Sequence, residues 1–163
     1  MKTLLLLLLT FVSGSIQAAQ IDGVPFVRQD SSFCGPASLA SVMAFYKVDI
    51  DQKTIGESVY IEALKGTLIT DLDNYAQSKG FITRLAQGSL ADIRGFIDQG
   101  RPLIVLVDLG FWFISRPHYL VVTGYTDDEI IAHTGYEASK HFTHEEFESI
   151  WQRKGSAYLV IHP

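Results

Sequence analysis

The sequence lacks internal repeats, low-complexity tracts and linkers rich in proline or serine. It also lacks an excess of positive charge, because 13 lysine and arginine residues stand against 18 aspartate and glutamate residues, for a net charge of −5. With 163 residues, of which 47% are hydrophobic, the chain is long enough for one domain with a real core. Without a basic stripe, nucleic acid and anionic membrane are not expected partners.

Motifs for cofactors and metals are missing as well. Nothing in the chain resembles a phosphate-binding loop or a dinucleotide-binding fingerprint. The five histidines do not show the spacing of metal ligands. They are His118, His133, His141, His144 and His162. We therefore predict a protein that works without a cofactor and without a metal.

Long hydrophobic runs are absent except at the start of the chain. Lys2 precedes an apolar run from Leu4 to Val12, and small and polar residues follow it as far as Ala19. This order is typical of a secretory signal peptide, and the run is too short to span a bilayer. The sequence predicts a signal peptide at residues 1–19 and an exported domain at 20–163, periplasmic or secreted and not membrane-spanning. An uncleaved anchor helix is the alternative.

The chain has a single cysteine, and exported proteins usually pair theirs, so Cys34 is either incidental or reactive. Pro36, which suits the first turn of a helix, follows closely, and apolar residues then recur at three- and four-residue steps from Leu39 to Tyr46. Cys34 is therefore predicted at the N-terminus of a buried helix. There the unpaired N–H groups and the helix dipole favour the reactive thiolate. The alternative is a small buried side chain.

Elsewhere the hydrophobic periodicity predicts helices first and an antiparallel sheet second. The predicted helices cover 35–47, 52–59, 66–79, 89–100 and 143–151, and the predicted strands cover 81–85, 102–108, 118–125, 129–134 and 156–161. This order is typical of an α+β fold. The aromatic loop Phe111–Ile114, just before the third strand, is predicted either to line a cleft or to pack in the core.

His118 opens the strand 118–125 directly after Pro117, where its side chain can face a cleft. Sulfur chemistry on an acyl group needs a base beside the thiol. His118 is therefore the candidate base for Cys34, although they lie far apart in the sequence. A hydrogen-bonded histidine at the end of a strand is the alternative.

Several motifs, taken in order, resemble the papain-like cysteine peptidases related to the bacteriocin-processing (double-glycine) peptidases. These motifs are Val24-Pro25-Phe26, Gln29, Cys34-Gly35-Pro36-Ala37-Ser38, Gly66-Thr67, Gly100-Arg101-Pro102 and Pro117-His118-Tyr119. The similarity extends from about residue 24 to residue 161 and implies a papain-like fold, with N-terminal helices on an antiparallel sheet, in an exported stand-alone peptidase. It also implies that Cys34 is the nucleophile, His118 the general base and Gln29 a donor to the oxyanion hole.

The third catalytic position departs from that family. Its members usually carry aspartate followed by proline at the end of the strand after the histidine strand, where this chain has His133-Thr134-Gly135. Alignment at equal length puts Thr134 in this position, and a shift of one residue puts His133 there. Thr134 could accept a hydrogen bond and orient His118, but it brings no charge to stabilise an imidazolium.

Together these residues predict a cysteine peptidase that acts on a peptide or protein substrate. Cys34 and His118 would form a thiolate–imidazolium pair, and the reaction would pass through an acyl-enzyme. Two alternatives stay open. One is a peptide-binding module on the same fold without catalysis, and the other is a thiol amidase or acyltransferase that acts on cell-envelope peptide.

Overall fold

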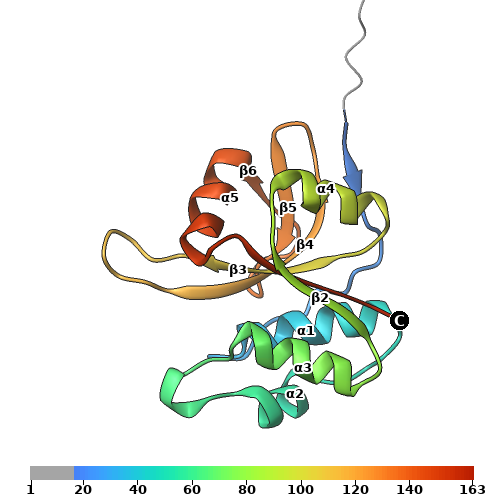
Figure 1. The fold of residues 1–163 in the computed structure, drawn as a ribbon, viewed down its shortest axis with the longest axis vertical. Helices are drawn as coiled ribbons and strands as arrows, with labels where there is room; N and C mark the ends of the chain where they lie inside the picture. Colours follow the sequence, from blue (N-terminus) through green and yellow to red (C-terminus); the bar gives the residue numbers. More distant parts are fainter. Residues whose placement is uncertain (1–16) are drawn as a thin grey trace, which may run out of the picture.

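The computed structural model describes residues 17–163, which form a seven-stranded antiparallel sheet between two layers of helices (Figure 1). The predicted signal peptide, apart from residues 17–19, lies outside the described residues, so cleavage and export stay predictions. The strands are β1 (Ala19–Gln20), β2 (Ile82–Gln87), β3 (Leu103–Asp108), β4 (Pro117–Tyr125), β5 (Glu129–His133), β6 (Lys140–Thr143) and β7 (Ala157–His162). The helices are α1 (Cys34–Phe45), α2 (Gln52–Val59), α3 (Ile69–Ser78), α4 (Leu90–Asp98) and α5 (His144–Trp151), with 3₁₀ turns η1 (Glu62–Leu64) and η2 (Gln152–Lys154).

The sheet order is β2-β7-β3-β4-β5-β6, and β1 pairs with the end of β4. Side chains alternate across the sheet, so Tyr119 and Val121 of β4 join the core beneath α1, α2 and α3. Leu120 and Val122 of the same strand face the opposite core, beneath α4 and α5. The predicted α+β class, with N-terminal helices on an antiparallel sheet, is confirmed.

Capping boxes mark the first turns of helices α4 and α5. Ser89 accepts from the backbone N–H of Asp92 at the start of α4, and Thr143 accepts from Glu146 in the same way at the start of α5. In each case the acidic side chain returns a hydrogen bond to the backbone of the capping residue. These local patterns fix where both helices begin.

Three segments differ from the sequence prediction. The third helix begins at Ile69 rather than at 66–67, because Gly66 pairs with Ile61 in an isolated bridge and Leu68 is extended. The edge strand β6 was not predicted, since it is short and mostly exposed. The loop Phe111–Ile114 neither packs in the core nor lines the main cavity, and its four side chains are 65–84% exposed.

Within residues 17–163, no helix combines the length and the apolar character needed to cross a bilayer.

Candidate active site

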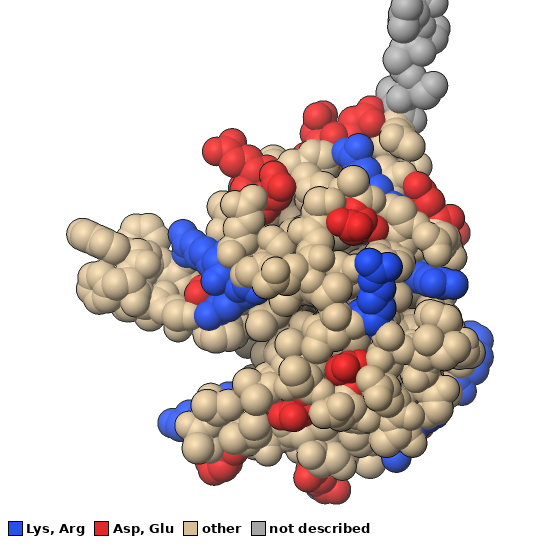
Figure 2. Space-filling view, viewed as in Figure 1, with Lys and Arg blue, Asp and Glu red and all other residues tan. Residues whose placement is uncertain are grey.

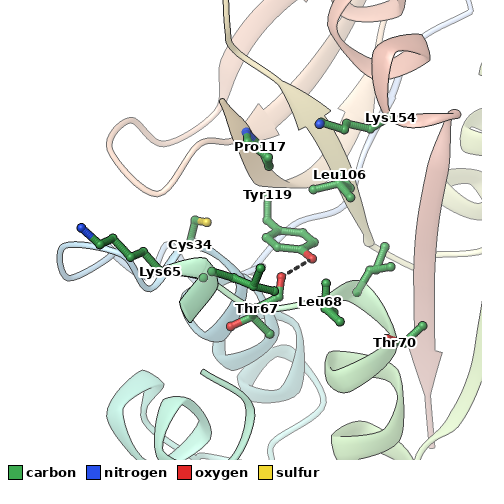
Figure 3. A pocket seen from close by; sticks show the side chains of 12 residues that line it. Cys34, Lys65, Thr67, Leu68, Thr70, Leu106, Pro117, Tyr119 and Lys154 are labelled. Carbon is green, nitrogen blue, oxygen red and sulfur yellow. Dashed lines mark hydrogen bonds between the residues drawn. The ribbon is translucent and has the colours of Figure 1, made fainter. Parts of the chain in front are cut away.

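Cys34 is the first residue of α1, as the sequence predicts, and its sulfur reaches a cavity beside the start of β4 (Figure 3). The close approach of α1 to β4 requires Gly35. A Cβ at that position would lie 3.2 Å from both Thr67 and the ring of Tyr119. The backbone N–H of Tyr119 interacts with the thiol of Cys34. Cys34 therefore meets β4 immediately beside His118.

Burial is the largest influence on the thiol, and it raises the pKa of Cys34 above the ordinary value of 9.0. The backbone N–H groups of Tyr119, Gly35 and Cys34 itself lower the pKa, but they do not outweigh the loss of water. The sequence predicted a thiolate from the helix terminus alone. The raised pKa favours the uncharged thiol instead, because partial burial removes water that would stabilise a negative charge.

His118 is buried, with 6% of its surface exposed, and its Nε2 lies 2.8 Å from the backbone carbonyl oxygen of Thr134. A carbonyl oxygen only accepts, so Nε2 carries the proton and donates it, which leaves the Nδ1 lone pair to act as a base. Burial lowers the pKa of His118 below 6.5. The contact with Thr134 raises it and the charge of Arg116 lowers it further. The imidazole is therefore neutral at neutral pH.

Thr134 does hold His118, but not through the group that the sequence suggested. The hydroxyl accepts from the backbone N–H groups of Tyr136 (3.2 Å) and Glu137 (2.9 Å), so it closes a tight turn after β5. The backbone carbonyl, not the hydroxyl, orients His118. The prediction that the Thr134 side chain replaces the family aspartate is wrong in this respect.

His133, the other candidate for the third position, has both ring nitrogens engaged elsewhere. Its Nδ1 accepts from the backbone N–H of Ser139 at 3.0 Å, and its Nε2 lies 3.1 Å from the carbonyl oxygen of Val24. These bonds tie the segment before α1 to the sheet. His133 therefore stabilises the fold and does not orient His118.

Gln29 lies beside the turn that holds His118. Its Nε2 donates to the carbonyl oxygen of Ser31 and to the hydroxyl of Tyr136, both at 3.0 Å. Its aliphatic stem and amide pack against Gly135, where a Cβ would collide with them and where φ is +80°. Both N–H donors of the predicted oxyanion residue are therefore occupied when no substrate is bound.

Tyr136 is a site residue that the sequence did not indicate. Its ring stacks on the imidazole of His118, with centroids 5.8 Å apart and planes 8° apart, and its hydroxyl accepts from Gln29. The residue is half exposed, so it separates His118 from water without closing the site. No sequence pattern near Tyr136, in the turn after β5, indicates that its ring contacts a residue of β4.

A cavity of about 590 Å³ extends from Cys34 between the start of α3 and the strands β3 and β4 (Figure 3). Its apolar walls are formed by Leu64, Leu68, Ile69, Leu106, Pro117 and Tyr119, and Lys65 and Lys154 also line it. The hydroxyl of Tyr119 donates to the carbonyl oxygen of Thr67 at 2.9 Å, and burial raises the pKa of Tyr119, so this wall stays protonated and fixed. The cavity can hold a large apolar side chain next to the sulfur.

The described part of the chain holds no cluster of three or more side chains suited to a metal ion.

Residues 21–159 match the sequence profile of the Peptidase_C39-like family. No curated protein matches the chain. Among solved structures, the chain is similar to a protein from Bacillus anthracis described as a C39-like peptidase, with a TM-score of 0.75 and 14% identity over 90% of this chain and 98% of that one. It is also similar to the peptidase domain of Streptococcus ComA, a bi-functional ABC transporter involved in a quorum-sensing pathway. The TM-score is 0.73, and the identity is 25% over 86% of this chain and 99% of that one. A third similar structure is a double-glycine-motif protease from an AMS/PCAT transporter in complex with the leader peptide. The TM-score is 0.72, and the identity is 18% over 89% of this chain and 94% of that one.

Proposed function

Because the chain belongs to the Peptidase_C39-like family, we propose that it is a cysteine peptidase in which Cys34 attacks the peptide bond and His118 moves the proton. The observation that carries the proposal is the hydrogen bond from His118 Nε2 to the carbonyl of Thr134. It fixes one tautomer and leaves Nδ1 as a base on β4, the strand that lines the same cavity as Cys34.

The resting pair in this proposal is neutral, which differs from the thiolate–imidazolium pair that the sequence suggested. Burial raises the pKa of Cys34 and lowers that of His118, so both groups are uncharged at neutral pH. The thiol proton moves to Nδ1 of His118 as the sulfur attacks the carbonyl carbon. The imidazolium then protonates the leaving amine, and water releases the acyl group from the sulfur.

The backbone N–H of Cys34, at the open end of α1, is one donor for the oxyanion that forms during the attack. Gln29 supplies the second donor when the substrate oxygen displaces the hydroxyl of Tyr136 from its Nε2. The bond from Gln29 to Ser31 keeps the amide in place during this exchange.

Gln29→Ala is expected to lower kcat by roughly ten- to a thousandfold and to change KM less, because an oxyanion donor acts mainly on the transition state. Tyr136→Phe is the matched control. It removes only the hydroxyl that accepts a hydrogen bond from Gln29 Nε2, so kcat should stay within about threefold of the parent value. Steady-state kinetics with one peptide measures both. An unchanged kcat in Gln29→Ala would leave the oxyanion to backbone donors alone.

The apolar cavity supports a peptide substrate with a large apolar residue near the cleaved bond, and the related transporter protease was solved with a leader peptide. The test is digestion of a mixed peptide library with the parent protein and with Cys34→Ala, followed by mass spectrometry. New termini should appear only with the parent and should share an apolar residue at one fixed position. Parallel digestion with an added amine separates hydrolysis from acyl transfer. Absence of any product would favour the peptide-binding alternative.

Leu106→Asp is expected to raise KM for the best apolar peptide by roughly tenfold or more, because it puts a charge in the cavity wall. Ile82→Asp is the control, since Ile82 is exposed on β2 and does not line the cavity. Its KM should match the parent value. Equal KM values in all three proteins would place the substrate outside this cavity.

A further inference from the structure

The loop between β3 and β4 carries an exposed cluster of apolar side chains that neither the core nor the proposed catalysis uses. We call Phe111, Trp112, Phe113 and Ile114 the aromatic finger. Their exposed fractions are 81%, 84%, 83% and 65%. In Figure 2 this loop projects from the body as a convex, uncharged tip. Large apolar side chains gathered in this way usually mark a surface that binds something.

The base of the finger is firmly built. The carboxylate of Asp108 accepts hydrogen bonds from the backbone N–H groups of Gly110 (2.8 Å) and Arg116 (2.7 Å) and from the hydroxyl of Ser115 (2.7 Å). A Cβ at Gly110 would collide with the backbone of Ile114, so the two ends of the loop are closely apposed. We call residues 108–110 and 115–116 the neck of the finger. Because these bonds fix the neck, the finger is already ordered before it binds, and binding costs little conformational entropy.

Three cations surround this neck. Arg116 is exposed and lies two residues after the finger, and the guanidinium of Arg153 donates to the carbonyl of Gly110 at 2.8 Å. Lys154 donates to Ser115 at 2.8 Å and lies 3.3 Å from Asp108. Asp108 offsets one of the three charges, which leaves the neck positive although the whole chain carries −5. Figure 2 shows this basic surface at the root of the projecting tip.

A second apolar edge lies across the catalytic cavity from the finger. Leu64 and Leu68 both line the cavity and are 58% and 47% exposed, and Lys65 lies between them. The segment that carries them and the finger project on the same side of the molecule, with a hollow between them (Figures 1 and 2). One flat surface could therefore touch both edges and cover the mouth of the cavity.

We propose that this side of the protein docks on an anionic lipid bilayer, with the aromatic finger inserted between headgroups and the neck cations beside the lipid phosphates. A convex tip with four apolar side chains in a row suits a fluid layer that closes around it, whereas a protein partner would need a matching deep socket. Tryptophan and phenylalanine are favoured at the membrane interface, and basic residues next to them add attraction to anionic lipid. The bilayer was not an expected partner from the total charge, because total charge does not reveal where cations gather.

Tryptophan fluorescence can measure whether the finger enters a bilayer. Of its two tryptophans, Trp112 is at the tip of the finger and Trp151 is buried, with 1% exposed. A Trp151→Phe protein therefore keeps a single tryptophan, Trp112, at the proposed contact, and selective excitation of tryptophan reports on it alone. It is titrated with phosphatidylcholine vesicles, with and without about one third phosphatidylglycerol. The emission of Trp112 should move to shorter wavelength with the anionic vesicles, and added salt should weaken binding.

Vesicle flotation of Cys34→Ala protein measures docking without any hydrolysis, so the result does not depend on the proposed peptidase activity. Phe111→Ser with Phe113→Ser, and separately Arg116→Glu, should each weaken binding to anionic vesicles by roughly tenfold or more. Ile82→Ser, an exposed apolar residue on β2, should bind like the parent. No shift of Trp112 emission and no flotation with anionic vesicles would overturn the inference. So would self-association in ultracentrifugation that the finger variants abolish, because the finger would then bind a second copy.

Discussion

Cys34→Ala and His118→Ala are each expected to lower kcat for peptide hydrolysis by roughly 10⁴- to 10⁶-fold, and the double variant should lose no more than the worse single variant. The reason is that nucleophile and base act as one unit, so either loss removes the same step. Steady-state or single-turnover kinetics on one peptide measures all three. Additive losses in the double variant would show that His118 acts separately from Cys34.

Comparison of the parent protein with His118→Ala also tests whether the resting pair is neutral. Burial holds the pKa of Cys34 above 9.0, so alkylation by iodoacetamide should rise with pH and show no plateau in the acid range. His118→Ala should change this alkylation profile little, because the histidine does not stabilise a resting thiolate. A fast acid plateau that disappears in His118→Ala would instead show the thiolate–imidazolium pair.

In the proposed mechanism, the protonation of His118 also sets the acid limb of hydrolysis. Its pKa is lowered below 6.5, so the base is neutral above that value and becomes protonated as pH falls through the folded-state pKa. Hydrolysis should therefore decline only below pH 6.5, and stability should decline over the same range, because the unfolded chain takes up the proton first.

Asp108→Ala is expected to lower the free energy of unfolding by roughly 2–4 kcal/mol, the largest effect on stability among the changes considered. The side chain of Asp108 is 8% exposed, and its removal leaves two backbone N–H groups and the hydroxyl of Ser115 without their acceptor. It also leaves Lys154 without its ion-pair partner. The partial exposure of Lys154 keeps the figure below that of a fully buried pair. Urea unfolding measures the loss, and Asp49→Ala, an exposed aspartate, is the control that should stay within about 0.5 kcal/mol.

The contribution of Asp108 to the free energy of unfolding should decrease at acid pH. Burial would raise the pKa of this carboxyl, but the bonds from Ser115, Arg116 and Gly110 outweigh it and hold the pKa well below 3.8. The carboxylate therefore adds stability that is complete above that value and is lost as pH falls below it. The difference between parent and Asp108→Ala should shrink below about pH 4. A difference that is constant with pH would mean that the charge of Asp108 contributes nothing.

Much of the candidate site could be predicted because its markers are local. A helix that begins at Cys34 follows from Pro36 and the apolar spacing behind it, and a strand that begins at His118 follows from the unbroken apolar run after Pro117. The capping residues Ser89 and Thr143, each with an acidic residue three positions later, are local markers of the same kind. The position of Gln29 came from the resemblance to a family and not from any periodicity, since it lies in a loop.

Other features depended on which segments meet. The aromatic finger has the composition of a core segment, and only the fold shows that no other part of residues 17–163 covers it. Tyr136 stacks on His118 because β4 and β5 pair in a particular register, which no local pattern near residue 136 encodes. The sequence predicts that the third helix begins at 66–67. In the structure Gly66 pairs with Ile61 instead, so the helix begins later, at Ile69.

By itself, the sequence determined the α+β order of elements and the placement of Cys34 and His118 at the start of a helix and of a strand. These features follow from hydrophobic period, capping residues and turn residues, which act over a few positions. The tertiary structure alone decided that the carbonyl of Thr134 rather than its hydroxyl holds His118, and that burial raises the pKa of the Cys34 thiol and lowers the pKa of the His118 imidazole. Hydrogen-bond partners and desolvation depend on atoms brought together from distant parts of the chain, so no local pattern can specify them.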